Sequence, residues 1–329
     1  MIIRHVALIF ADGFQVLKLG IIEKLSAVMK MNKHVFFDRL AIGLISVLLG
    51  KRKYFSRSID SDPIEKHLEE IAFILPELIQ KGDYEIPASS LIGDFDPAVK
   101  VVQWLGYDFP SIIYHHDFNE RPFELHEDAR NTFFQLFIKW PRRIPANLLL
   151  VRAPFHNGKL SHYIEKITDL NQFIAMLSGQ AKITQGIVKQ FRSRSSESVI
   201  VTGVGLGGWI TNLHRAYYNS AQAYVPILAG AKLEEMLLTS HFRHLCSKEA
   251  LANRDAISKK ISFFQKFRTV TTSNLYPVLA RYDQLVDYTV QKPAYNGFPL
   301  RTFNNGHISA ILRPALYREH ILEVLQMYS

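Results

Sequence analysis

The sequence predicts an α/β fold with a mostly parallel central sheet flanked by helices, and three observations favour it. From residue 109 onward, short apolar runs alternate with amphipathic stretches, the pattern of strands joined by crossover helices. A β-branched run at 199–202 leads through a glycine-rich turn at 203–208 into an amphipathic stretch. The chain has 329 residues, of which 48% are hydrophobic, so it can bury a large core.

An early strand is expected before residue 109, and the core elements then follow one another to residue 329. Strands are expected at 99–105, 110–116, 147–152, 199–202, 223–228, 275–280 and 300–303, and helices at 124–140, 170–190, 209–217 and 314–327. The stretch 230–270 is mostly helical and follows the strand after the glycine-rich turn. We therefore assign 109–329 to an α/β core with a small helical cap inserted at about 230–270.

Residues 1–108 predict a mostly helical extension packed on that core. Apolar residues have helical spacing over 14–25, and the run 40–50 is too short to span a bilayer, so it predicts a buried helix. Ser61-Asp62-Pro63 is typical of a helix start. The apolar face that follows predicts a helix over 64–82.

The turn at the centre of the chain reads Gly203-Val204-Gly205-Leu206-Gly207. Strand, sharp turn and helix in this order resemble the nucleophile elbow of the α/β-hydrolase fold, whose pattern is Gly-x-Ser-x-Gly. The flanking glycines match, but Gly205 stands at the nucleophile position. Glycine tolerates the strained backbone of such an elbow. It has no side-chain oxygen, so it cannot form an acyl-enzyme.

Two further motifs follow the elbow in the order that the family uses. The segment 279–286 resembles the acid loop, with Asp283 as the matching carboxylate, and 304–309 resembles the histidine loop, with His307 matching. The resemblance implies that Asp283 orients the imidazole and that His307 is the general base. Asp287 is an alternative acid.

The resemblance also implies an oxyanion hole made by two backbone N–H groups. One is expected from Leu206, just after the nucleophile position. The other is expected from Asp117 or Phe118, in the loop 115–120. Many family members have His-Gly where this chain has His116-Asp117. A carboxylate of Asp117 that pointed inward would repel an oxyanion.

The resemblance implies an esterase-like or lipase-like serine hydrolase for a small ester or an apolar acyl ligand. With Gly205 the chain as written is expected to be inactive, either as a natural pseudoenzyme or as a serine-to-glycine variant, so its standing as an enzyme stays open. The alternative is a binding or scaffold protein that holds an apolar ligand or a partner in its capped pocket. Fold alone does not decide between them.

Other sites are less well supported by the sequence. Gly203, Gly205 and Gly208 also satisfy the dinucleotide pattern Gly-x-Gly-x-x-Gly, but several strand–helix units precede them and the next strand carries no acid. We expect no cofactor and no metal, because His241 and His244 lack a neighbouring carboxylate. The chain's one cysteine, residue 246, is expected to be buried and inert.

The net charge of +9 indicates a basic surface. Its basic clusters are not interleaved with aromatic residues, so we expect no nucleic-acid partner. The cluster 51–53 leaves peripheral contact with an acidic membrane open. A single cysteine, no signal-peptide pattern and no apolar run long enough to span a bilayer favour a cytoplasmic protein. The sequence does not indicate an oligomeric state.

Overall fold

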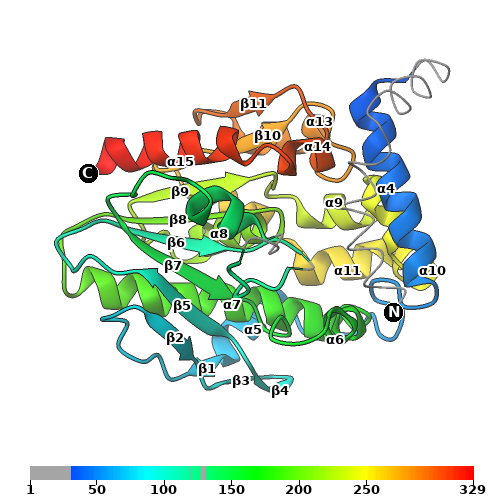
Figure 1. Ribbon diagram of the computed structural model, residues 1–329. Coiled ribbons are helices and arrows are strands. Elements are labelled where there is room, and N and C mark those ends of the chain that lie inside the picture. Colours follow the sequence, from blue (N-terminus) through cyan, green and yellow to red (C-terminus); the bar gives the residue numbers. More distant parts are fainter. Residues whose placement is uncertain (1–30, 119, 127–130) are drawn as a thin grey trace.

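The computed structural model describes residues 31–118, 120–126 and 131–329. This part of the chain has three layers, with a central sheet between two layers of helices (Figure 1). The helix expected over 14–25 lies outside the described residues.

The central sheet has eight strands in the order β11-β10-β9-β8-β6-β7-β5-β2. From β7 to β11 the neighbouring strands are parallel, whereas β5 is antiparallel to both β7 and β2. The strands are β2 (Gly82–Glu85), β5 (Ala98–Gln103), β6 (Ser111–His115), β7 (Asn147–Arg152), β8 (Val199–Val204), β9 (Ala223–Ile227), β10 (Val278–Ala280) and β11 (Arg301–Phe303). The predicted mostly parallel sheet is confirmed.

Helices cover both faces of this sheet because side chains along each strand alternate between its faces. On one face, Ile113 and Val201 share a buried cluster with α7 and α8. On the other face, Ile112 and Ile200 share a second cluster with α15 and the π-helical turn η2. The helical elements are α4 (Lys33–Leu49), α5 (Ile64–Glu70), η2 (Phe134–Ile138), α6 (Leu160–Lys166), α7 (Leu170–Arg192), α8 (Leu206–Tyr217), α9 (Leu233–Leu238), η3 (His241–Leu245), α10 (Lys248–Ala252), α11 (Arg254–Ile261), α12 (Phe264–Thr269), α13 (Tyr288–Gln291), η4 (Lys292–Tyr295), α14 (His307–Ile311) and α15 (Pro314–Tyr328).

The expected helix over 64–82 is wrong beyond Glu70, where α5 ends. Ile71 is already extended, and Pro76 prevents a regular helix from continuing to residue 82, because it lacks an N–H donor and disfavours a helical conformation at the residue before it. The chain instead forms β1 (Ala72–Phe73), β3 (Ala88–Ser90) and β4 (Gly93–Phe95), which make a small antiparallel sheet. Since β2 and β5 join the central sheet, the mostly helical character expected before residue 109 is limited, among the described residues, to α4 and α5.

Two other expected helices also differ from the structure. The run 40–50 lies in α4 and is buried on only one face, because Leu44 is 40% and Val47 79% exposed. The helix expected over 124–140 begins later, since residues 121–126 are not helical and η2 covers only Phe134–Ile138. Residues 127–130 lie outside the description.

Glycines bring β6, β8 and α8 close together around the central turn. A Cβ atom added to Gly207 would lie 2.0 Å from the carbonyl oxygen of His115, at the end of β6. One added to Gly203 would lie 2.5 Å from the backbone carbon of Gly207. The contacted atoms belong to the backbone and cannot move aside. Glycine at both positions is therefore required by this packing.

We expect Gly207→Ala to lower the free energy of unfolding by more than about 3 kcal/mol, because its methyl group overlaps the β6 backbone. Gly43→Ala is the matched control, since Gly43 lies exposed in α4 with nothing within 4 Å of an added Cβ. That control should change stability by about 1 kcal/mol or less, towards greater stability. Urea unfolding measures both variants, and equal effects would contradict the packing argument.

Candidate functional site

The central turn lies at the carboxyl end of β8, where α8 begins. Gly205 joins the two elements with φ +54° and ψ −113°, a backbone conformation that side chains rarely adopt. Its N–H donates to the carbonyl oxygen of Ile227 at the end of β9. The turn thus has the sharp geometry of a nucleophile elbow, with no side chain at its tip.

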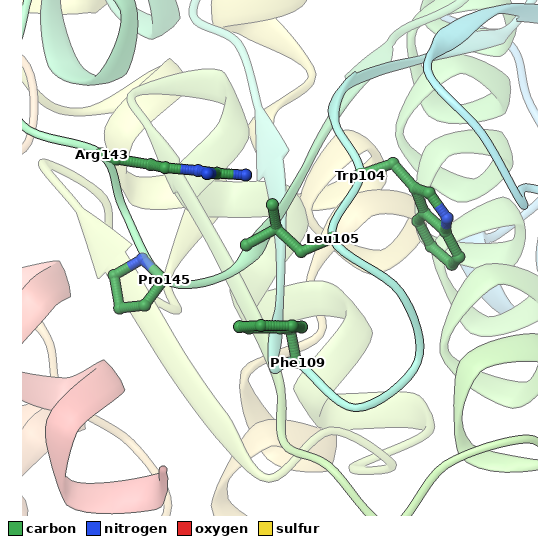
Figure 2. A pocket seen from close by; sticks show the side chains of 5 residues that line it. All are labelled: Trp104, Leu105, Phe109, Arg143 and Pro145. Carbon is green, nitrogen blue, oxygen red and sulfur yellow. The ribbon is translucent and has the colours of Figure 1, made fainter.

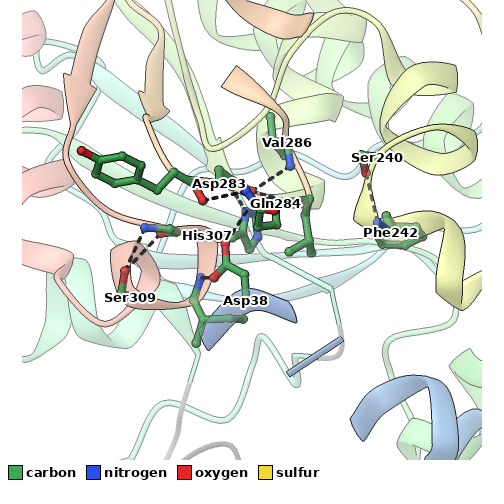
Figure 3. A network of polar contacts seen from close by, with 12 residues as sticks. Asp38, Ser240, Phe242, Asp283, Gln284, Val286, His307 and Ser309 are labelled. Carbon is green, nitrogen blue, oxygen red and sulfur yellow. Dashed lines mark hydrogen bonds and ion pairs between the residues drawn. The ribbon is translucent and has the colours of Figure 1, made fainter. Parts of the chain in front are cut away.

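Asp283 and His307 meet although 24 residues separate them. His307 Nδ1 lies 2.7 Å from Asp283 Oδ2. The other carboxylate oxygen of Asp283 accepts hydrogen bonds from the backbone N–H groups of Leu285 and Val286. The two side chains are buried, His307 at the start of α14 and Asp283 in the loop after β10 (Figure 3). This pairing leaves His307 Nε2 as the ring nitrogen available to other groups.

Asp117 provides the third part of the site, and here its side chain matters more than its amide. Its Oδ1 accepts hydrogen bonds from the backbone N–H of Leu206, at 3.0 Å, and of Phe118, at 2.7 Å. These two N–H groups are among the oxyanion donors expected from the sequence. A Cβ atom added to Gly205 would lie 1.9 Å from the same oxygen. The Asp117 carboxylate therefore fills the space of a nucleophile side chain and occupies the two donors.

A third carboxylate of the site, that of Asp38 in α4, was not among the residues expected from the sequence. Its Oδ2 accepts from the backbone N–H of Gln284 at 3.1 Å and of His307 at 2.7 Å. Its Oδ1 accepts from Ile308 at 3.0 Å. Asp38 is fully buried and holds the acid loop and the histidine loop together (Figure 3). The one available signal was a charged residue within an apolar helical run, because buried charges need partners.

Gly306 makes this docking possible. A Cβ atom added there would lie 2.8 Å from Asp38 Oδ2 and 2.9 Å from the carbonyl oxygen of His34. The His34 Nδ1 atom lies 2.8 Å from the hydroxyl of Ser309, so α4 and α14 are joined by a second polar contact. Helix α4 is thereby fixed against the loop that carries His307.

The electrostatics of the site follow from these three carboxylates. Burial alone would lower the pKa of His307, but the charges of Asp283, Asp117 and Asp38 outweigh it and raise that pKa to about 9. Burial raises the pKa of Asp117 above its usual range and, together with the charge of Asp283, raises that of Asp38 to about 6. A pKa above neutral favours the imidazolium form of His307 at pH 7. In that state it cannot accept a proton as a general base.

We expect the free energy of unfolding to fall as pH rises through 9. The pKa of folded His307, about 9, exceeds the ordinary value of 6.5, so the stabilisation is fully present below pH 6.5 and is lost as pH rises through 9. The loss is on the order of 3 kcal/mol. Urea unfolding between pH 6 and pH 10 measures it. His307→Ala should lack this component, and identical pH profiles for the two proteins would contradict it.

Aromatic side chains pack beside Asp117 on the side of the cap insertion. The ring of Phe118 lies 6.4 Å from that of Phe242 in η3, which in turn lies 5.0 Å from the ring of Tyr54. The hydroxyl groups of Tyr54 and Tyr163 are 3.3 Å apart and buried. These rings help to exclude water from this side of the site. This agrees with burial as the main cause of the raised pKa of Asp117.

Two cavities of the molecule lie away from this site. One, of about 430 Å³, is lined by Trp104, Leu105, Phe109, Arg143 and Pro145 (Figure 2). It lies where β6 and β7 begin, at the edge of the sheet opposite the carboxyl ends that carry the site. The other, of about 620 Å³, lies around Phe155 and α6. Neither cavity is lined by Gly205, Asp117 or His307.

The remaining candidate residues are also located by the structure. Cys246 is buried, and burial raises its pKa to about 12, so its thiol stays protonated. The rings of His241 and His244 lie 4.6 Å apart. Within the described ranges, however, three or more His, Cys, Asp or Glu side chains nowhere gather as a metal site would require. None of the helices described is long and apolar enough to cross a membrane.

No protein-family model and no curated protein sequence matches this chain. Acetyl xylan esterase 1 from Thermoanaerobacterium sp. JW/SL YS485 is similar in structure, with 13% identity and a TM-score of 0.51 over 84% of this chain and 98% of that one. A Pyrococcus furiosus esterase is 10% identical, with a TM-score of 0.50 over 82% and 97%. The Pyrococcus horikoshii acylaminoacyl peptidase is 12% identical, with a TM-score of 0.50, and 77% of this chain matches 43% of that protein. The chain has the α/β-hydrolase fold.

Proposed function

We propose that this α/β-hydrolase-fold chain belongs to the carboxylic ester or acyl hydrolase type and lacks acyl-enzyme chemistry, because Gly205 stands at its nucleophile position. The observation that supports the proposal is the structure at the tip of the elbow. Gly205 has the strained backbone conformation of an elbow nucleophile, but it has no hydroxyl group. The carboxylate of Asp117 lies where the side chain of a nucleophilic serine would be. The glycine is either a natural loss or a substitution.

The Asp283–His307 pair supports the lineage rather than an unrelated use of the fold. The 2.7 Å contact uses Nδ1 of the imidazole and leaves Nε2 as the nitrogen that would accept a proton from a serine. Without that serine, the pair has no hydroxyl proton to accept at residue 205. An ester can then be hydrolysed only at the background rate of exposed protein groups.

Turnover of p-nitrophenyl esters with short and long acyl chains tests this proposal. The wild-type protein and His307→Ala should hydrolyse each ester at the same low rate, with both proteins shown to be folded by circular dichroism. A wild-type rate that clearly exceeds the His307→Ala rate would overturn the proposal, because the imidazole would then act on a nucleophile after all.

The alternative function, a binding or scaffold protein with an apolar ligand, has less support. The two cavities described above do not include the elbow, and the aromatic rings beside Asp117 pack against one another. Calorimetry with a series of fatty acids would detect such a ligand without any turnover.

A further inference from the structure

We propose that the pocket formed by the Leu206 and Phe118 amides and His307 is a carboxylate-binding site, whose resident ligand is the chain's own Asp117. The inference rests on one part of the proposed function, namely that Gly205 stands where a nucleophile would be. It goes further because it names the chemical class of ligand that the pocket takes. It also makes Asp117 the group that keeps this pocket closed to any substrate or product.

The pocket is assembled from three separate segments of the chain. Leu206 provides the first N–H of α8, Phe118 provides an N–H from the loop after β6, and His307 comes from the start of α14. One oxygen of Asp117 lies 3.0 Å and 2.7 Å from the two amide nitrogens, which are hydrogen-bond distances to a charged acceptor. Aligned peptide dipoles at the start of α8 add to the attraction for an anion.

His307 supplies the opposite charge. Only 6% of the residue is exposed, and among the described residues its Nε2 atom has no hydrogen-bond partner. The charge of Asp117 raises the pKa of His307, and the charge of His307 lowers the pKa of Asp117, as expected for two nearby groups of opposite charge. The carboxylates whose charges raise the pKa of His307 are those of Asp283, Asp117 and Asp38. Of these, the carboxylate of Asp117 is the one bound to the pocket amides.

The loop that presents Asp117 is held in place by its neighbour. The Nδ1–H group of His116 can donate to the carbonyl oxygen of Asp117, at 2.8 Å, while Nε2 accepts from the backbone N–H of Ala153, at 3.0 Å. Burial keeps the pKa of His116 well below its usual range, so the ring stays neutral and makes both contacts. His116 is thus a positioning residue. An intramolecular carboxylate fixed in this way has a high effective concentration, which a free ligand must overcome.

A substrate carbonyl or a released carboxylic acid would therefore have to displace Asp117 to reach the two amides. Removing the side chain should convert this internal site into an open one. Acetate is the matching probe, because its methyl and carboxylate groups correspond to the Cβ and carboxylate of aspartate. Asp117→Gly leaves the space of that whole side chain, whereas Asp117→Asn keeps it filled.

The experiment titrates Asp117→Gly with sodium acetate, against sodium chloride at equal ionic strength, and follows the His307 ring by NMR. The pKa of His307 should be lower in Asp117→Gly than in the wild type and should rise again on saturation with acetate. The melting temperature should rise in parallel. Wild type and Asp117→Asn should show neither response at acetate concentrations up to about 100 mM, a range in which a preorganised internal ligand still competes.

A folded Asp117→Gly protein in which acetate shifts neither the His307 pKa nor the melting temperature would overturn the proposal. If that variant does not fold, the wild type still tests it. The amide proton resonances of Leu206 and Phe118 should move together as Asp117 titrates, and amides that ignore this titration would contradict the pocket. Neither result depends on ester turnover, so failure of this inference is distinguishable from failure of the proposed function.

Discussion

A protein carrying both Gly205→Ser and Asp117→Gly should hydrolyse p-nitrophenyl acetate at least about 100-fold faster than Gly205→Ser alone. Serine restores the missing nucleophile, and glycine at 117 removes the carboxylate that lies 1.9 Å from the new Cβ position. The same change frees the Leu206 and Phe118 amides to stabilise an oxyanion. It also removes one of the charges that hold His307 protonated, which favours its action as a base.

Gly205→Ser alone is the informative comparison. Its side chain cannot be accommodated without moving Asp117, so the single variant should stay inert and lose stability. The triple variant with His307→Ala should lose the activity that the double variant gains. Initial rates of folded proteins measure all three. Equal rates for the single and double variants would contradict the role assigned to Asp117.

Asp38→Ala should lower the free energy of unfolding by more than about 3 kcal/mol, because it leaves one buried and two partly buried N–H groups without an acceptor, at about 1–3 kcal/mol each. These N–H groups belong to Gln284, His307 and Ile308. The loss should also disturb the Asp283–His307 contact, because Gln284 is adjacent to Asp283. Urea unfolding gives the energy, and the downfield proton signal of His307 Nδ1 reports the contact.

Asp60→Ala is the control for Asp38→Ala. Asp60 is 95% exposed and pairs with Lys260, so its removal should cost little stability. Asp38→Ala should weaken the Nδ1 proton signal of His307, whereas Asp60→Ala should leave it unchanged. Equal stability of the two variants would contradict the claim that Asp38 of α4 fixes the acid loop and the histidine loop.

Much of the fold could be predicted from periodicity and motif order. The alternation of apolar runs located most of the parallel strands, and the glycine-rich turn located the join between β8 and α8. The order of the elbow, Asp283 and His307 in the chain indicated that Asp283 and His307 would meet. No local sequence pattern specifies their 2.7 Å contact. The helix expected over 64–82 was too long because periodicity was followed across Pro76.

The contacts of Asp117 and Asp38 could not be predicted from periodicity or motif order. Sequence placed Asp117 in the right loop but did not indicate which way its side chain points, since that depends on the space left open at Gly205. Asp38 acts on backbone groups 246 to 270 positions further along the chain, and no spacing encodes such a contact. Both are long-range side-chain-to-backbone bonds. Predicting them requires the packed structure.

The most direct test of the central claim is labelling of the wild-type protein with a fluorophosphonate, followed by intact-mass and peptide mass spectrometry. This reagent reacts with hydroxyl groups that a neighbouring base has activated, which is the chemistry that Gly205 excludes. The account predicts no adduct on the folded wild type and one adduct at residue 205 in the Gly205→Ser and Asp117→Gly double variant. An adduct on any wild-type residue that disappears in His307→Ala would contradict it, because His307 would then serve a nucleophile elsewhere in the site.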